Sequence, residues 1–224
     1  MSDAQSGADW GDTKGQLPAG WVIDPTTAEE VAAQETVYVP FTDRLRELVD
    51  LGIRSEVDLE TIREAQTHVE AAIELLGQDV MEGSYGVRIG DGFGRNWGNA
   101  IMGLRNATAP PLHIQTDRVS RSWVDFNLGA AYEGPPTMVH GGVLSLVLDH
   151  VFGAAAGADH TPHMTGTLTL RYRRPTRLGV PLRAEAWIDR KEGRKSFVEG
   201  FVADEEGRTV EAEGIFIQPR RWAR

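Results

Sequence analysis

The C-terminal half of the chain alternates hydrophobic and polar positions, except where one long apolar segment interrupts the alternation. Alternation over Leu112–Asp117 and Arg118–Leu128 predicts a hairpin around Asp117. The apolar segment predicts a helix from about Gly141 to Gly157. Four more alternating segments predict strands over Thr165–Arg173, Leu182–Lys191, Arg194–Ala203 and Arg208–Gln218. Because short turns that end in glycine join the last three strands and no helix separates them, we expect an antiparallel sheet.

The apolar helix determines the expected architecture. Its hydrophobic residues cover nearly every side of the helix from Val143 to Ala156. A helix that is apolar all round must be enclosed. One long helix followed by a curling antiparallel sheet is enclosed when the sheet wraps around it, which predicts an α+β hotdog fold.

The N-terminal half carries a weaker pattern. Residues 1–37 show no sustained period, which predicts a flexible lead. A cluster of apolar residues predicts a short helix over Phe41–Ile53, and a 3–4 spacing predicts a second helix from Ile62 to Leu76. The glycine-rich segment 83–111 predicts a loop packed on a neighbouring element. The resulting division of the chain is a flexible lead over 1–37, a helical extension over 38–85 and a hotdog domain over 86–224.

Charge and composition exclude several classes of function. The 224 residues carry a formal net charge of −10, which argues against binding to nucleic acid or anionic membranes. Cysteine is absent, which excludes a disulfide, a thiolate nucleophile and a zinc–thiolate site. The polar N-terminus does not fit a signal peptide, and Asp149 and His150 interrupt the longest apolar run, so we expect a cytoplasmic protein that does not span a membrane. Residues 24–82 hold fifteen acids against four arginines, which indicates a solvated helical face or a docking surface for a basic partner.

A motif surrounds the apolar helix and joins a turn, a helix start, one acid and the following strand. Its parts are Glu133-Gly-Pro-Pro, His140-Gly141-Gly142, Asp149 and Met164-Thr165-Gly-Thr-Leu-Thr-Leu-Arg-Tyr172-Arg-Arg-Pro175. This combination resembles the hotdog-fold acyl-CoA thioesterases of the phenylacetate-pathway (PaaI) type, and the Glu-Gly-Pro-Pro turn is similar to the branch with the mammalian thioesterase-superfamily members. The resemblance covers about residues 103–218. It implies an acyl-CoA substrate that water converts to a free acid and CoA, with no separate cofactor.

The start of the helix offers hydrogen-bond donors. Thioester hydrolysis needs a donor for the developing oxyanion and a base or nucleophile for the carbon. Gly141 and Gly142 lie where helix amides are unpaired and the macrodipole is positive, and they let a carbonyl oxygen approach closely. The alternative for this glycine pair is close packing of the helix on the sheet. His140 either orients the loop, donates a hydrogen bond or is purely structural.

Asp149 is the predicted nucleophile or general base, because an acid inside an apolar helix is costly unless it is used or paired. The resemblance implies this role and leaves open whether Asp149 attacks the carbon directly or activates water. Thr165 matches the position at which relatives carry a hydroxyl that orients water, although threonine is also common in strands. Several relatives carry an asparagine about six residues before the histidine of the motif, and Gly134 stands there in this chain.

The spacing of these residues predicts a homodimer. Gly142 and Asp149 are seven residues apart, which is about 10 Å along a helix axis. One thioester carbonyl can hardly meet both residues of a single chain, whereas two antiparallel helices from two subunits bring them together. We therefore expect two sites shared between the subunits. The resemblance implies the same arrangement, in some relatives as a homotetramer.

A basic segment follows the apolar helix. Residues 166–195 hold nine Lys and Arg residues against three Asp and Glu residues. Strand alternation places Thr165, Thr167, Thr169, Arg171 and Arg173 on one face. Local positive charge suits the phosphates of CoA, and solubility of an exposed strand face is the alternative. The predicted phosphate-binding group is Arg173, Arg174, Arg194 and Lys195.

Other functions fit the sequence less well. A hotdog module that binds acyl-CoA without turnover is the main alternative to an enzyme. A hotdog hydratase is disfavoured because Asp149 and His150 are adjacent and point in different directions. Metal binding by residues near the end of the helix is disfavoured because two of the histidines fall in a Thr-Pro loop; these residues are His150, Asp159, His160 and His163. The glycines of 90–94 lack the Lys-Ser/Thr of a phosphate loop.

Overall fold

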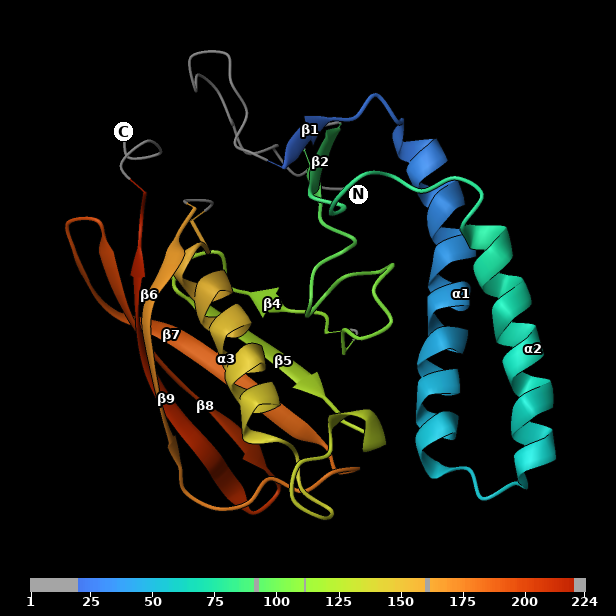
Figure 1. Ribbon diagram of the computed structural model, residues 1–224. Coiled ribbons are helices and arrows are strands. Elements are labelled where there is room, and N and C mark those ends of the chain that lie inside the picture. The colour runs from blue at the N-terminus through green and yellow to red at the C-terminus, as the bar shows by residue number, and fades with distance from the viewer. Residues whose placement is uncertain (1–19, 91–92, 111, 160–161, 220–224) are drawn as a thin grey trace, which may run out of the picture.

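The computed structural model describes residues 20–90, 93–110, 112–159 and 162–219 (Figure 1). A six-stranded antiparallel sheet curves around one long helix, α3 (Gly141–Ala156), as the sequence predicted. The strands lie in the order β4-β5-β7-β8-β9-β6. Their bounds are β4 Gln115–Thr116, β5 Arg121–Phe126, β6 Met164–Tyr172, β7 Leu182–Glu192, β8 Lys195–Asp204 and β9 Gly207–Ile217. The α+β hotdog fold and the predicted strands are thus confirmed.

The core lies between α3 and the concave face of the sheet. The helix buries one side fully, including Leu148 and Phe152, which are 0% exposed. Phe152 packs closely against the backbone of β8, since a β-carbon at Gly200 would lie 2.6 Å from its ring. Glycine is needed here because any side chain would push the helix away from the sheet.

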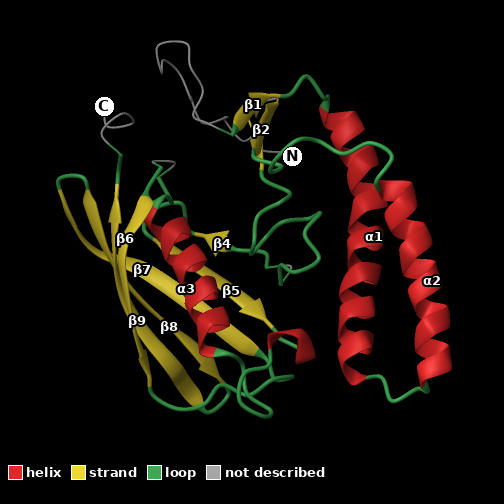
Figure 2. Cartoon of the chain, viewed as in Figure 1, coloured by secondary structure: helices red, strands yellow, loops and turns green. Residues whose placement is uncertain are grey.

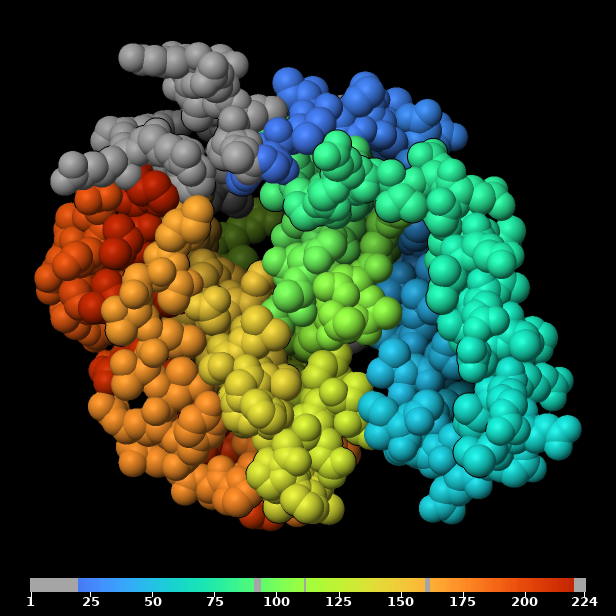
Figure 3. Space-filling model, viewed as in Figure 1, coloured from blue at the N-terminus to red at the C-terminus, as the bar shows by residue number. Residues whose placement is uncertain are grey.

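The opposite side of α3 is open, which differs from the prediction of a fully enclosed helix. Leu146 is 41% exposed, and α3 reaches the surface of the described residues in the view of Figure 3. The sheet is curved but not closed, so it reaches only one side of the helix (Figure 2). An apolar helix with an open side indicates a surface that another molecule covers.

Strand β6 contains a bulge, so the prediction that Thr165 and Thr167 lie on one face of the strand is wrong. Thr165 pairs with buried Phe216, whereas Thr167 pairs with Ile215, so Gly166 is an extra residue in the strand. Because one extra residue reverses the faces of a strand, Thr165 points toward α3 and Thr167 points to the outer face. A β-carbon at Gly166 would lie 2.8 Å from the end of the Ile217 side chain and 3.1 Å from the Ile215 carbonyl oxygen, so glycine avoids crowding at the bulge.

The N-terminal part contains more regular structure than the sequence indicated. Helices α1 (Ala28–Arg54) and α2 (Leu59–Leu76) lie side by side (Figure 1). Residues 1–19 of the predicted lead lie outside the described residues, and the end of that lead is helical. Thr27 and Glu30 start α1 with a capping box, so this helix begins well before the predicted start at Phe41.

Three short strands form a separate small sheet next to these helices. They are β1 Trp21–Ile23, β2 Val87–Gly90 and β3 Phe93–Arg95. The segment 83–111 was therefore only partly predicted, because it contains two strands as well as a loop. Arg46 of α1 ties the helices to that loop by donating to the carbonyl oxygens of Ala109 and Asn106 at 3.2 and 3.1 Å. Helix α2 buries no side chain.

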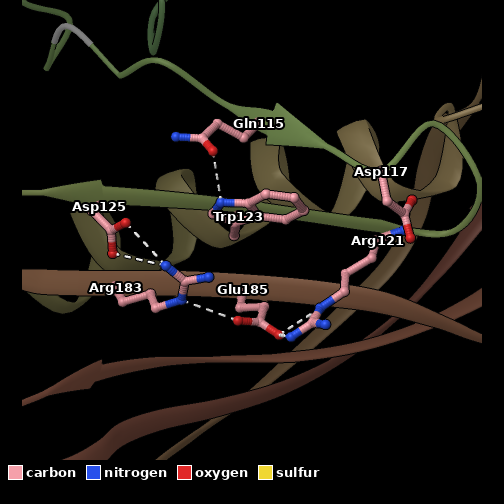
Figure 4. Close-up of polar contacts among 7 residues, drawn as sticks. All are labelled: Gln115, Asp117, Arg121, Trp123, Asp125, Arg183 and Glu185. Atoms are coloured by element: carbon pink, nitrogen blue, oxygen red, sulfur yellow. Dashed lines mark hydrogen bonds and ion pairs between the residues drawn. The ribbon is translucent and has the colours of Figure 1, made fainter.

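The outer face of the sheet carries an ion-pair cluster (Figure 4). Glu185 of β7 is 6% exposed and accepts hydrogen bonds from Arg121 of β5 and from Arg183, the latter at 3.1 Å. Burial acts to raise the pKa of the Glu185 carboxyl, but the two guanidinium groups outweigh it, so this pKa is lowered. Arg183 also donates to Asp125, and Trp123 donates to Gln115 beside it. The cluster joins β5 to β7 on the face away from α3.

Candidate active site

His140 caps the start of α3 with its side chain. The Gly142 amide donates to the His140 Nδ1 at 2.9 Å, so the imidazole takes the place of a Ser or Asp cap. This engages one of the two amides that the sequence predicted to be unpaired. No acceptor is recorded for the other amide, that of Gly141, among the residues that the structure describes. The Gly141 amide is therefore the available donor at this helix start.

The turn before the helix explains the missing asparagine. Gly134 donates to the Met138 carbonyl at 2.9 Å, and Glu133 and Val139 form an isolated bridge. A β-carbon at Gly134 would lie 2.7 Å from the His140 Cα. This position has no room for an asparagine side chain without moving His140.

Asp149 lies on the open side of α3 and is partly exposed. Its Oδ1 accepts a hydrogen bond from the Thr165 hydroxyl at 2.8 Å. The bulge at Gly166 makes this contact possible. In a regular strand residues 165 and 167 share one face, so Thr165 would point outward together with Thr167. The structure therefore brings together two of the predicted site residues and leaves the carboxylate accessible.

The helix start and Asp149 remain apart within one chain. Eight residues separate Gly141 from Asp149, which is about 12 Å along the helix. Tyr172 adjoins the helix start, where its hydroxyl donates to the Gly141 carbonyl at 2.8 Å. Thus the two ends of β6 adjoin the two halves of the site, with Tyr172 beside Gly141 and Thr165 beside Asp149.

The four predicted phosphate-binding residues do not form one group within the chain. Lys195 lies in register with Ile217 and Met164, at the end of the sheet opposite to Tyr172. The length of β6 therefore separates Arg173 and Arg174 from Arg194 and Lys195 by roughly 25–30 Å. The other ion contacts are local: Arg173 pairs with Glu211, Arg174 with Asp204 and the Gly207 carbonyl, and Arg194 with the Gln218 carbonyl. Within one chain the four residues therefore lie at two ends of the sheet, a separation that strand alternation alone does not predict.

The residues considered for a metal site have other contacts. His150 Nε2 lies 3.1 Å from the Met102 sulfur, Asp159 pairs with Lys191 at 2.8 Å, and His163 lies 3.2 Å from the Ser196 hydroxyl. His160 lies outside the described residues. Within the described ranges, no three His, Asp or Glu residues are placed to hold a metal ion. No helix there is long and apolar enough to cross a bilayer.

Burial lowers the pKa of His150, and the negative charge of Asp149 opposes that effect. The unfolded chain therefore binds a proton near the ordinary pKa of 6.5 at pH values where the folded chain does not. We expect the free energy of unfolding to fall as the pH drops below about 6.5. Thermal unfolding between pH 7.5 and 5 should show a weaker pH dependence for His150→Asn than for wild type. The same substitution at exposed His113 is the control, and equal slopes for all three proteins would contradict the expectation.

The fold and the site define a class of protein. They are a curved antiparallel sheet, a long apolar helix that begins at His140-Gly141-Gly142, and an accessible Asp149, and the sheet and helix together define the hotdog fold. Residues 137–211 match the family model of the thioesterase superfamily. The resemblance to the thioesterase superfamily that the motif predicted is therefore confirmed over that part of the chain.

Individual proteins support this assignment. Acyl-coenzyme A thioesterase THEM4 of Xenopus laevis is 33% identical over 95 residues, which are 42% of this chain and 43% of that protein. The THEM4 protein of Bos taurus is 30% identical over 95 residues, 42% of this chain and 39% of that protein. These matches span less than half the length of either relative. A crystal structure of a thioesterase superfamily protein has a TM-score of 0.70 and 28% identity, and it covers 88% of this chain and 98% of that one.

Proposed function

We propose that this protein is an acyl-CoA thioesterase that hydrolyses a thioester to a free acid and CoA, with Asp149 as its nucleophile or general base. The observation that carries the proposal is the hydrogen bond from Thr165 to a partly exposed Asp149 on the open side of an apolar helix. A carboxylate in this setting has an oriented oxygen and access to substrate. The names of the THEM4 relatives support the same substrate class.

The proposed reaction uses the two halves of the site at one carbonyl group. Water adds to the thioester carbon while Asp149 takes its proton, or Asp149 first forms an acyl-enzyme that water then hydrolyses. The Gly141 amide stabilises the negative charge that develops on the carbonyl oxygen. The carbon–sulfur bond breaks, and the CoA thiolate leaves and gains a proton. The products are one carboxylic acid and one free thiol.

We infer that two copies of the chain complete each site. Strand β6 is an edge strand whose other side is unpaired by any described element, and most of its residues are exposed. Antiparallel pairing of two β6 strands places the Tyr172 end of one beside the Thr165 end of the other. Because those ends adjoin Gly141 and Asp149, the pairing brings Gly141 of one chain toward the partner's Asp149. It also covers the open side of α3.

The same pairing supports a composite site for the CoA phosphates. It moves the end of the sheet that carries Arg173 toward the end that carries the partner's Lys195. Lys195 has no recorded polar contact among the described residues, so its charge is available. Arg174 holds the β8–β9 turn through Asp204 and Gly207, which gives it a structural role as well.

A panel of acyl-CoA thioesters, from acetyl to long-chain and aryl, tests the proposal by release of free thiol. We expect at least one substrate with kcat/KM of about 10⁴ M⁻¹s⁻¹ or more, the lower end of ordinary enzyme efficiency. Absence of thiol release across the whole panel, with binding of acyl-CoA retained, would instead identify a non-catalytic acyl-CoA-binding module.

A further inference from the structure

Tyr172 makes a close contact with the start of α3. It is the last residue of β6, and its ring lies so near the helix that a β-carbon at Gly141 would be 3.2–3.3 Å from its atoms. Its hydroxyl donates to the Gly141 carbonyl oxygen at 2.8 Å. The strand after the helix thus holds the first peptide group of the helix in place.

The same peptide group contacts His140 at its other end. The carbonyl of Gly141 and the amide of Gly142 belong to one peptide unit, and that amide donates to the His140 Nδ1 at 2.9 Å. A donor on the carbonyl makes the amide of the same peptide a better donor. Because Nδ1 accepts a hydrogen bond, the proton of the neutral imidazole must be on Nε2.

The turn before α3 bears on the role of the His140 Nε2–H group. The Gly134 backbone packs against His140 and leaves no room for an asparagine donor. His140 is exposed and comes from the same chain as the available Gly141 amide. The chain therefore offers two potential donors on consecutive residues at this helix start.

We propose that Tyr172 is a positioning residue, which acts through the Gly141–Gly142 peptide to hold His140 in the tautomer with its proton on Nε2. In this state the His140 Nε2–H and the Gly141 amide together donate to the thioester carbonyl oxygen. The donor role of His140 rests on the proposed thioesterase function. The tautomer and its dependence on Tyr172 do not.

The first test measures the tautomer directly. Nitrogen-15 NMR of protein labelled in histidine reports Nδ1 and Nε2 of His140 separately, with His140→Ala used for assignment. We expect wild type to show the Nε2-protonated tautomer, and Tyr172→Phe to shift both signals toward a mixture. Tyr132→Phe is the matched control, since its hydroxyl also donates to a backbone carbonyl, that of Thr108, at 3.2 Å. Unchanged His140 signals in Tyr172→Phe would overturn the proposal.

The second test measures whether the effects of Tyr172 and His140 on kcat are coupled. We expect Tyr172→Phe to lower kcat about tenfold with little change in KM, and His140→Ala to lower it about 10²-fold. If Tyr172 acts through His140, we expect the double variant with Tyr172→Phe and His140→Ala to have a kcat less than about twofold below that of His140→Ala alone. Multiplicative losses would overturn the positioning role. A wild-type protein that hydrolyses no thioester would refute the proposed function, while the NMR result would still decide the tautomer.

Discussion

Asp149→Asn should lower kcat on the best acyl-CoA substrate by at least about 10²-fold, because the amide can neither attack the thioester carbon nor accept a proton from water. The substitution keeps the size of the side chain, and its oxygen can still accept the Thr165 hydrogen bond seen at 2.8 Å. The loss should therefore appear in kcat rather than in folding or substrate affinity.

Steady-state thiol release measures this effect, and binding of a non-hydrolysable acyl-CoA analogue measures affinity. Asp189→Asn is the control, since Asp189 is an exposed carboxylate on the sheet that pairs with Arg190. An Asp149→Asn protein that hydrolyses as fast as wild type would refute the catalytic role of Asp149. An inactive variant that still binds the analogue would exclude loss of folding as the cause.

Hybrid dimers should regain activity that neither parent variant has. One chain carries Asp149→Asn and the other His140→Ala, and two affinity tags allow the hybrid to be purified after co-expression. If each site takes its helix start from one chain and its carboxylate from the other, one of the two sites is intact. We expect about half of the wild-type activity per dimer.

The matching control is a hybrid with two tags in which both chains carry Asp149→Asn, which should stay at the level of the single variant. Sites built within one chain would leave the mixed hybrid inactive. A monomer in solution at assay concentration would refute the shared site as well, and sedimentation velocity measures this independently.

The sequence predicted the elements whose pattern is set by burial. The long apolar run predicted α3, and alternation predicted the long strands, because each of them faces a largely apolar core. The chemistry of the site followed from the same source. An acid at position 149 in an apolar helix is conspicuous, and its partner Thr165 lay at the start of the next strand.

What the sequence did not reveal depends on single residues and on position along the sheet. The bulge at Gly166 adds one residue to the strand, and the hydrophobic periodicity does not reveal it. The contact of Tyr172 with Gly141 and the capping by His140 also depend on tertiary placement. The basic residues around Arg173 and Lys195 looked like one group because the pattern carries no information on which end of the sheet each occupies.

Helix α2 gives this molecule two levels of local stability. It buries no side chain, whereas α1 beside it is fastened to the rest of the chain by Arg46. Its amides will exchange with deuterated solvent long before those of β8, because few contacts are lost when α2 opens. The chain therefore melts as at least two cooperative units, and one midpoint temperature will not describe the stability of both.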